Sequence, residues 1–149
     1  MDAAQLYKHA ITHGSAVAAA TLVDRLGQLH PADFRPALWA AAHSALDDPG
    51  AVAELLYALR EVGAQEQVEV LAARAAADAA LDDPDAVTRL LDALRKVRAQ
   101  DQVEALAARL PAAGQFDQFI EISDHRERFR YGREPNGSAG PPWTWDDLA

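Results

Sequence analysis

Two histidines near the amino end of the chain have a spacing that suits metal binding. His9 and His13 are four residues apart, so a helix would place both imidazoles on one face. The zinc-protease motif with this spacing needs a glutamate directly after the first histidine as general base, and Ala10 occupies that place. No third ligand lies nearby in the sequence. We therefore expect two surface histidines near a helix carboxyl end, and no metal site.

A second pair of residues has the chemistry to cleave RNA. Arg25 and His30 form an Arg-x4-His pattern, in which histidine can transfer protons and arginine can hold a phosphate. The pattern resembles that of the helical ribonucleases of bacterial defence systems, the HEPN class, and the resemblance implies a nuclease centred on these two residues. Because Pro31 ends the helix directly after His30, an exposed arginine and a helix-terminal histidine are the alternative.

Four arginines near the carboxyl end are interleaved with aromatic residues, a combination that can stack on nucleic-acid bases and neutralise phosphates. The arginines are Arg126, Arg128, Arg130 and Arg133, and the aromatic residues are Phe129 and Tyr131. The acidic neighbours Asp124, Glu127 and Glu134 offset most of this charge. We therefore expect salt bridges that anchor the tail, with Asp146 and Asp147 as further partners, rather than a nucleic-acid site.

The composition excludes several classes of protein. The formal net charge of −9 argues against nonspecific binding to nucleic acid or to an anionic membrane, although a local basic patch would override that average. Cysteine is absent, so the chain has no disulfide and no thiolate metal site. No apolar run is long enough to span a membrane, and the amino end lacks the pattern of a signal peptide, so we expect a cytoplasmic protein. The preference for arginine over lysine indicates a GC-rich bacterial genome.

The strongest pattern in the chain is a duplication. Leu46–Arg74 and Leu81–Arg109 are identical at 21 of 29 positions, at an offset of 35 residues without a gap. Each copy predicts a helix, a short turn and a second helix, and periods of this size are typical of stacked α-repeat arrays. In each copy an Asp-Asp-Pro sequence starts the first helix, with the second aspartate as cap and proline at the first helical position. The second helices start near Gln65 and Gln100.

The rest of the chain gives the domain organisation. We predict a helical repeat domain over 1–123, with clear repeats at 46–80 and 81–114, a degenerate repeat at 15–45 and a capping helix at 115–123. A first helix over 3–13 precedes them, and 124–149 form a charged tail that contains tryptophan. In the degenerate repeat we expect helices over Ala16–Leu29 and from Asp33 to Ala45. The residues expected to face inward in the first of these helices are Val17, Leu22, Val23, Leu26 and Leu29, and the second carries Phe34, Leu38 and Trp39.

The differences between the two copies fall on one face of the first helix. This variable face consists of Gly50, Ala53, Glu54, Tyr57 and Glu61 in one copy and of Asp85, Thr88, Arg89, Asp92 and Lys96 in the other. The identical positions form the opposite face and must pack. The variable face is either a solvated surface that is free to drift or a binding surface of varied chemistry. Tyr57 is its best anchor, because an exposed tyrosine buries a large area at small entropic cost.

The repeat unit resembles the tetratricopeptide-like class of helical repeats. The matching positions, counted from Leu56, are Leu59, Ala72, Ala79 and Pro84. The chain departs from the family at Ala76, where the family has an aromatic residue, and in its period of 35 rather than 34 residues. The resemblance covers Leu46–Arg109 well and 15–45 weakly. It implies that a peptide or protein binds on the face of the first helices.

The tail contains two tryptophans at a spacing of two, Trp143 and Trp145, which would face the same side of an extended segment. Such a strip can cap the last repeat of its own chain, enter a neighbouring molecule, or dock on another protein. The second of these alternatives makes the chain a tail-mediated oligomerisation module, that is, a homo-oligomer.

Together these patterns predict an all-α fold of antiparallel helix-pair repeats, stacked as a short right-handed α-solenoid with a 35-residue period. The function that we expect is a non-enzymatic scaffold or adaptor that binds a protein or peptide, with no catalytic residues, no metal, no cofactor, and neither a membrane nor a nucleic-acid partner. The HEPN-like ribonuclease and the oligomerisation module are the alternatives. The predicted partner-binding residues are Glu54, Tyr57, Glu61, Arg89, Asp92, Lys96, Trp143 and Trp145.

Overall fold

A computed structural model of the chain describes residues 15–122, residues 135–142, and Gln5, His9, Glu127, Arg130 and Tyr131. Of the predicted first helix only Gln5 and His9 are described, and both are helical and exposed. Several residues singled out above lie outside the described part of the chain: His13, Arg126, Arg128, Arg133, Trp143 and Trp145. The predictions made for these residues remain predictions.

The chain divides into two compact units, Met1–Leu106 and Ala107–Ala149. The elements of the first unit are α2 (Ala16–Leu29), α3 (Arg35–His43), α4 (Pro49–Glu61), α5 (Gln65–Asp78), α6 (Pro84–Lys96) and most of α7 (Gln100–Ala107). The second unit contains a short 3₁₀ helix, η1 (Pro111–Ala113), and α8 (Phe116–Ile120). Every element of the described residues is thus a helix, which confirms the all-α class, while the predicted boundary between the repeat domain and the tail remains a prediction.

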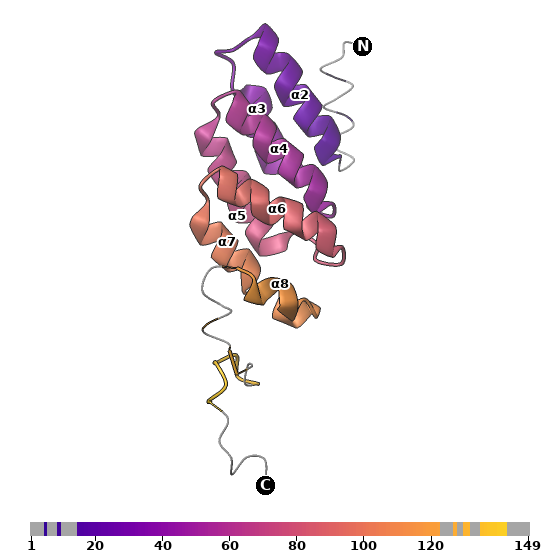
Figure 1. Ribbon diagram of the computed structural model, residues 1–149. Helices are drawn as coiled ribbons and strands as arrows, with labels where there is room; N and C mark the ends of the chain where they lie inside the picture. The colour runs from indigo at the N-terminus through magenta and orange to yellow at the C-terminus, as the bar shows by residue number, and fades with distance from the viewer. Residues whose placement is uncertain are drawn as a thin grey trace. The chain divides into compact units, whose positions relative to one another are not determined.

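The helices of the first unit pack in two layers (Figure 1). In one layer α4 lies between α2 and α6 and packs against both. In the other layer α5 packs against α3, and the layers are joined where α2 meets α3 and α4 meets α5. Because each helix buries only one stripe, this helix-on-helix packing is what creates the core.

The two clear repeats begin their first helices in the same way. Asp48 caps α4, and its carboxylate accepts a hydrogen bond from the Ala51 backbone N–H at 3.2 Å. Asp83 caps α6 by accepting from the backbone N–H groups of Asp85 and Ala86, at 3.0 and 3.2 Å. In both helices the following proline occupies the first turn, where its missing N–H costs nothing. The predicted capping of both helices is therefore confirmed.

The two helices also end in the same way. The N–H of Gly63 donates to Arg60 O and the N–H of Ala64 to Leu59 O, which is the Schellman pattern for a helix end. In α6 the same two bonds run from Arg98 to Arg95 and from Ala99 to Leu94. Both turns need a left-handed residue, and Gly63 and Arg98 supply it with φ of 76° and 63°.

Most of the core is formed by apolar residues that are identical in the two copies. All side chains in this set are less than 2% exposed except that of Leu91, at 4%: Val52, Leu55, Leu56 and Leu59 in α4, Val87, Leu90, Leu91 and Leu94 in α6, Val68, Leu71 and Ala72 in α5, and Val103, Leu106 and Ala107 in α7. A fully buried leucine or valine contributes about 1.5–3 kcal/mol by its removal from water. The packing face inferred from the duplication is therefore confirmed.

The degenerate repeat differs from its prediction. α2 has the predicted bounds and Ser15 caps it by accepting from the Ala18 N–H at 3.1 Å, but Val17 and Leu29 are 57% and 70% exposed rather than buried. α3 starts at Arg35 and ends at His43, shorter than predicted at both ends. Pro36 explains the late start, because it has no N–H to continue a helix from Asp33 and fits only in a first turn.

The inward face of α3 is made of alanine. Ala37, Ala40 and Ala41 are buried, whereas Phe34 and Leu38 are 42% and 58% exposed. Because α3 packs against both α2 and α5, small side chains on this face allow a close approach of the helices. Phe34 and Leu38, two of the large apolar residues of this segment, therefore lie outside its packing face.

In the second unit the predicted capping helix is shorter and is preceded by a turn. Gly114, with φ of 79°, separates η1 from α8, and the predicted helix over 115–123 is reduced to Phe116–Ile120. Phe119 and Ile122 are buried, and the ring of Phe116 lies 5.8 Å from that of Phe119. This unit therefore has apolar packing of its own.

Candidate functional site

The variable positions of α6 are all presented to solvent. The exposed side chains are those of Asp85, Thr88, Arg89, Asp92 and Lys96. They lie opposite the buried leucines Leu90 and Leu94 of the same helix. α6 therefore offers an exposed face of alternating charge.

The variable positions of α4 are partly covered, because this helix lies between two others. Glu54 and Glu61 are exposed, Gly50 and Tyr57 are half-buried, and Ala53 is 2% exposed. A side chain at Gly50 would place its Cβ 3.7 Å from Arg89 Nη1. Position 50 of α4 therefore lies next to a side chain from the variable face of α6.

Tyr57 and Lys96 join the two variable faces. The Lys96 ammonium nitrogen lies 5.5 Å from the centre of the Tyr57 ring, within the range of a cation–π contact. Tyr57 and Lys96 are 39 residues apart in the sequence, and so are Gly50 and Arg89. This separation equals the repeat period of 35 residues plus about one turn of helix, so in both cases the residue of α4 meets the α6 residue one turn beyond its own counterpart. The structure therefore brings predicted binding residues of two different copies together on one surface.

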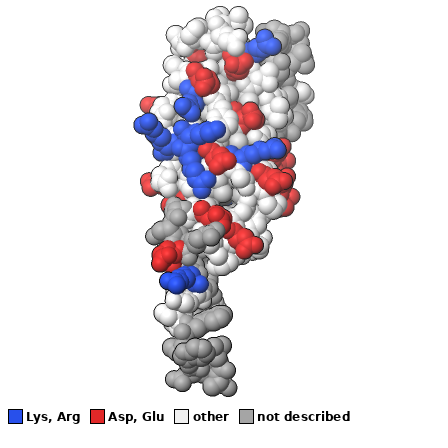
Figure 2. Space-filling model, in the orientation of Figure 1, with Lys and Arg blue, Asp and Glu red and all other residues white. Residues whose placement is uncertain are grey.

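Basic side chains gather where α4 and α6 end. Exposed Arg60, Arg95, Lys96 and Arg98 form what we call the basic cluster. Figure 2 shows lysine and arginine side chains concentrated in one area of this face, with acidic side chains around it. Arg60 lies about one helical turn after Tyr57, so its side chain leaves α4 next to the Tyr57 ring that Lys96 contacts. The cluster is the local basic patch that the overall charge of −9 conceals.

Only one member of the basic cluster has an ion pair within the described residues. Arg95 Nη1 lies 3.1 Å from Asp92 Oδ1, and both side chains are about half exposed, at 43% and 54%. Glu61, although next to Arg60 in sequence, lines a hollow on the other side of α4 together with Asp24 and Gln28 of α2. Its carboxylate therefore lies away from the α6 side of the face.

Arg98, a member of the basic cluster, has a backbone conformation that is unfavourable for a residue with a side chain. Its φ of 63° is the left-handed conformation, which costs a residue with a Cβ about 1 kcal/mol relative to right-handed backbone. The other copy has Gly63 at this position, which adopts the conformation without strain. Arg98 is the one non-glycine residue of the described part of the chain with a positive φ.

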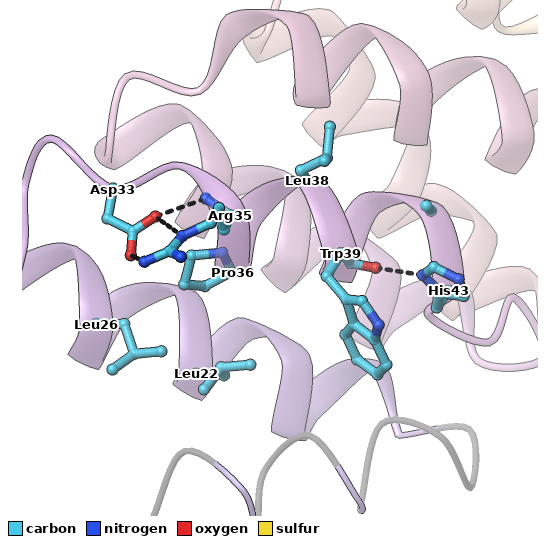
Figure 3. A pocket seen from close by; sticks show the side chains of 9 residues that line it. Leu22, Leu26, Asp33, Arg35, Pro36, Leu38, Trp39 and His43 are labelled. Atoms are coloured by element: carbon cyan, nitrogen blue, oxygen red, sulfur yellow. Dashed lines mark hydrogen bonds and ion pairs between the residues drawn. The ribbon is translucent and has the colours of Figure 1, made fainter.

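A second candidate surface is a groove between α2 and α3 with a volume of about 470 Å³. Its lining is mainly apolar and consists of Leu22, Leu26, Pro36, Leu38, Trp39 and Ala42, with Asp33, Arg35 and His43 at its borders. Figure 3 shows Asp33 and Arg35 at one end of the groove and Trp39 and His43 at the other. We call this surface the α2–α3 groove.

The two charged residues of the groove are paired with each other. Arg35 Nε and Nη2 donate to the two carboxylate oxygens of Asp33, each at 2.8 Å, and the Arg35 backbone N–H donates to Asp33 Oδ1 at 3.1 Å. The hydrogen bonds from the Arg35 side chain and backbone lower the pKa of Asp33 to about 2. The same carboxylate raises the pKa of Arg35. The pair therefore stays ionised over the physiological pH range.

At the other end of the groove, Trp39 and His43 stack with their ring centres 4.9 Å apart and their planes inclined by 21°. His43 Nδ1 lies 3.0 Å from the Trp39 carbonyl oxygen, so this nitrogen donates a hydrogen bond to it. The carboxyl end of α3 is further fixed by Arg74 of α5, which donates to the carbonyl oxygens of Ala41 and Ser44 at 2.6 and 3.0 Å. The groove therefore has a well-defined wall.

The groove exists because the degenerate repeat lacks a turn of helix that the clear repeats have. α5 starts at Gln65 and buries Val68 in its first turn, whereas the corresponding stretch before α3 is a loop with Pro31. The residue 35 positions before Val68 is Asp33, whose carboxylate turns outward to Arg35. No apolar side chain replaces Val68, and Leu22 and Leu26 remain open to the groove.

The residues of the ribonuclease pattern lie at the end of α2. Arg25 is exposed on the helix, and His30 is its exposed carboxyl cap, with its backbone N–H donating to Leu26 O at 2.8 Å. His30 lines a shallow hollow with Leu29, Pro31, Ala32, Asp33 and Arg35. Arg25 is not among the residues that line this hollow.

Two kinds of site are absent from the described residues. Within them, no group of three histidine, aspartate or glutamate side chains is arranged to hold a metal ion. None of the helices in that part of the chain has the length and apolar character needed to cross a membrane.

Sequence reasoning missed three of the four residues of the basic cluster. Arg60 and Arg95 are identical in the two copies and therefore do not appear among the differences. Arg98 differs from Gly63, but it lies in the turn rather than on the first helix, where the differences were collected.

Compared with known protein families, with curated proteins and with solved structures, the chain matches none.

Proposed function

We propose that the protein is a non-enzymatic scaffold, a short right-handed α-solenoid of tetratricopeptide-like repeats with a 35-residue period, that binds a peptide segment of another protein. The binding surface is the outward face of α4 and α6. The observation that carries the proposal is the exposure of every variable residue of α6 beside the half-buried Tyr57 of α4.

The separation of roles within each repeat supports this surface. The apolar residues of the first helices that are identical between the copies, such as Val52, Leu55 and Leu59, fill the core, so their identity is explained by packing. The residues that differ are all exposed on α6 and partly exposed on α4, and they change chemistry strongly, for example from Glu54 to Arg89 and from Tyr57 to Asp92. Changes of this kind leave the fold intact and give each repeat its own contacts, which is how stacked repeats build extended binding surfaces.

The α2–α3 groove is the less favoured surface. Its two charged residues, Asp33 and Arg35, satisfy each other through a two-point ion pair, so neither is free to select a ligand. On the α4–α6 face, in contrast, Arg60, Lys96 and Arg98 have no ion pair within the described residues. Charged groups without an ion pair make a surface specific, because a ligand that lacks matching groups leaves these charges unpaired.

The proposal can be tested by selecting peptides from a random display library on the immobilised full chain. Selected peptides are then measured by titration against Tyr57→Ala, Arg89→Ala and Asp92→Ala. Glu69→Ala and Asp78→Ala are the matched controls, because both residues are exposed on α5 in the other layer. Melting curves of every variant show whether the fold is kept.

We expect at least one face variant to raise the Kd about tenfold or more, since central interface residues carry most of the binding energy. The controls should bind as the unchanged chain does. If no peptide is selected, or if every selected peptide binds the face variants and the controls equally, the α4–α6 face is not a binding surface and the proposal is rejected.

A further inference from the structure

The basic cluster is anomalous in a chain with 23 acidic and 14 basic residues. Arg60, Arg95, Lys96 and Arg98 are all exposed at the ends of α4 and α6. Two of the four appear only in the second copy, where Lys96 and Arg98 replace an acidic residue and a glycine of the first. The end of the first helix and the following turn are therefore more basic in the second copy than in the first.

The cationic groups of the cluster are largely uncompensated. Within the described residues Arg60 and Arg98 have no ion pair, and Lys96 contacts the Tyr57 ring instead of a carboxylate. Asp92 engages Arg95 on the exposed flank of α6. Of the carboxylates that are close to the cluster in sequence, that of Glu61 lies towards α2, and those of Glu66 and Asp101 are in the first turns of α5 and α7, where a helix amino end stabilises negative charge.

The backbone of Arg98 is an independent indication that the side chains of the cluster have a function. A left-handed turn is satisfied by glycine at no cost, as Gly63 shows in the first copy. An arginine there is strained, and backbone strain is retained in proteins mainly at functional positions. Its guanidinium is exposed and makes no compensating contact within the described residues.

We propose, resting on the scaffold function above, that the basic cluster and Tyr57 bind a short anionic peptide segment of a partner protein. Arginine is suited to carboxylate and phosphate groups because its planar guanidinium donates two parallel hydrogen bonds. Clusters of arginine are a recurrent way of recognising acidic and phosphorylated peptide motifs. Tyr57 and the stem of Lys96 supply the apolar contact beside these charges.

A peptide fits this surface better than a nucleic acid does. RNA or DNA carries its charge along an extended backbone, and most of its phosphates would lie over the acidic remainder of a chain of net charge −9. A short peptide confines its negative charge to the area of the cluster. The acidic side chains around the basic area in Figure 2 then limit the length of the anionic segment.

The test uses the full chain and fluorescence polarisation of labelled synthetic peptides. One probe has glutamates on both sides of a tryptophan, a second has phosphoserines at the same places, and a third has glutamines. A short oligouridine RNA is the fourth probe. The decisive variant is Lys96→Glu combined with Arg98→Gly, because the first copy already holds Glu61 and Gly63 there and the turn is kept.

The charge control is Ala73→Glu combined with Ala77→Glu. Both alanines are exposed on α5, in the layer that does not carry the cluster. The control makes the chain more acidic, as the decisive variant does, but leaves every cation of the cluster in place. It therefore separates the loss of specific contacts from a general rise in repulsion between chain and probe.

We expect the glutamate or phosphoserine probe to bind and the glutamine probe to bind at least about tenfold more weakly, since several ion pairs at about a few-fold each are lost together. The Lys96→Glu, Arg98→Gly variant should weaken anionic-peptide binding by about tenfold, the α5 control should leave it nearly unchanged, and added salt should weaken it. The two anionic probes show whether carboxylate or phosphate is the preferred group.

Three results would overturn the anionic-peptide site. The glutamine probe could bind as tightly as the anionic probes do. The decisive variant and the α5 control could weaken anionic-peptide binding equally. Oligouridine could bind more tightly than the peptides do, through the residues of the basic cluster. A dimer in light scattering that the decisive variant dissociates would make a second copy of the chain the occupant. If display-selected neutral peptides still bind the α4–α6 face while no anionic probe does, the anionic-peptide site is rejected and the scaffold function stands.

Discussion

Gly63 and Arg98 share the same left-handed backbone conformation, at φ of 76° and 63°, in helix-ending turns that lie 35 residues apart. Both turns make the same pair of backbone hydrogen bonds to the preceding helix. The conformation is therefore imposed by the helix ending and not by the residue. A comparison of these two positions separates the energy of the backbone from that of the side chain.

Arg98→Gly should stabilise the fold. Relief of the left-handed strain of about 1–2 kcal/mol exceeds the extra unfolded-state entropy of glycine, about 0.4–1 kcal/mol, so the free energy of unfolding should rise by roughly 0.5–1 kcal/mol. Urea denaturation followed by circular dichroism measures it. Gly63→Ala is the matched reverse change, because nothing lies within 4 Å of the added Cβ, and it should lower stability by a similar amount. Equal signs for the two variants would contradict the strain at position 98.

Gly27→Ala should destabilise the protein although alanine is the better helix former. A Cβ at Gly27 of α2 would overlap Val62 Cγ1, because α2 and α4 approach closely at this point. Overpacking of this kind typically costs about 1–3 kcal/mol, more than the roughly 1 kcal/mol gained in helix propensity. Thermal and urea unfolding measure the net effect. The double variant Gly27→Ala with Val62→Ala should recover part of the loss, and additive effects of the two changes would show that they do not touch.

The sequence predicted the first helices of the clear repeats well because chemistry at their ends is specific. An Asp-Pro pair directly before an apolar run of helical period favours a helix start, and the observed caps Asp48 and Asp83 agree with it. Duplication then separated core from surface, since Leu55 and Leu90 are retained while Tyr57 and Asp92 are exchanged. Two copies of one unit carry the information that a single copy lacks.

The degenerate repeat could not be predicted in the same way. α3 has one stripe of large apolar residues, with Phe34 and Leu38, and a second stripe of small ones, with Ala37, Ala40 and Ala41. Periodicity alone cannot decide which stripe is buried, and the choice depends on how closely α3 approaches α2 and α5. The α2–α3 groove and the basic cluster depend likewise on contacts between helices. These contacts are set by tertiary packing, which no local pattern encodes.

Arg74→Ala should destabilise the fold by about 1.5–3 kcal/mol, the range for hydrogen bonds that involve a charged group. Arg74 of α5 donates to the Ala41 and Ser44 carbonyl oxygens at the carboxyl end of α3, where a cation also favours the helix dipole. Arg25→Ala on α2 is the control, because it removes the same kind of side chain from an exposed helix position. Chemical denaturation compares the two. Equal effects for Arg25 and Arg74 would mean that the bonds to α3 do not contribute.

Asp33 should titrate well below an ordinary aspartate. The hydrogen bonds from Arg35 hold its pKa at about 2 in the folded chain, against 3.8 ordinarily. Because the folded pKa is the lower one, the stabilisation from this pair is complete above pH 3.8 and is lost as the pH falls from there through about 2. Carboxyl carbon chemical shifts in an NMR titration report the midpoint. Arg35→Ala should return it towards 3.8, and an unchanged midpoint would assign the shift to another cause.

His30→Ala should leave any RNA cleavage by the purified chain unchanged. His30 is exposed at the end of α2, and Arg25, which would hold the phosphate, does not line the hollow at His30. The assay follows the breakdown of a labelled single-stranded RNA by the full chain, by His30→Ala and by Arg25→Ala. The three proteins should give the same background rate. Robust cleavage that both substitutions abolish would replace the scaffold with a helical ribonuclease.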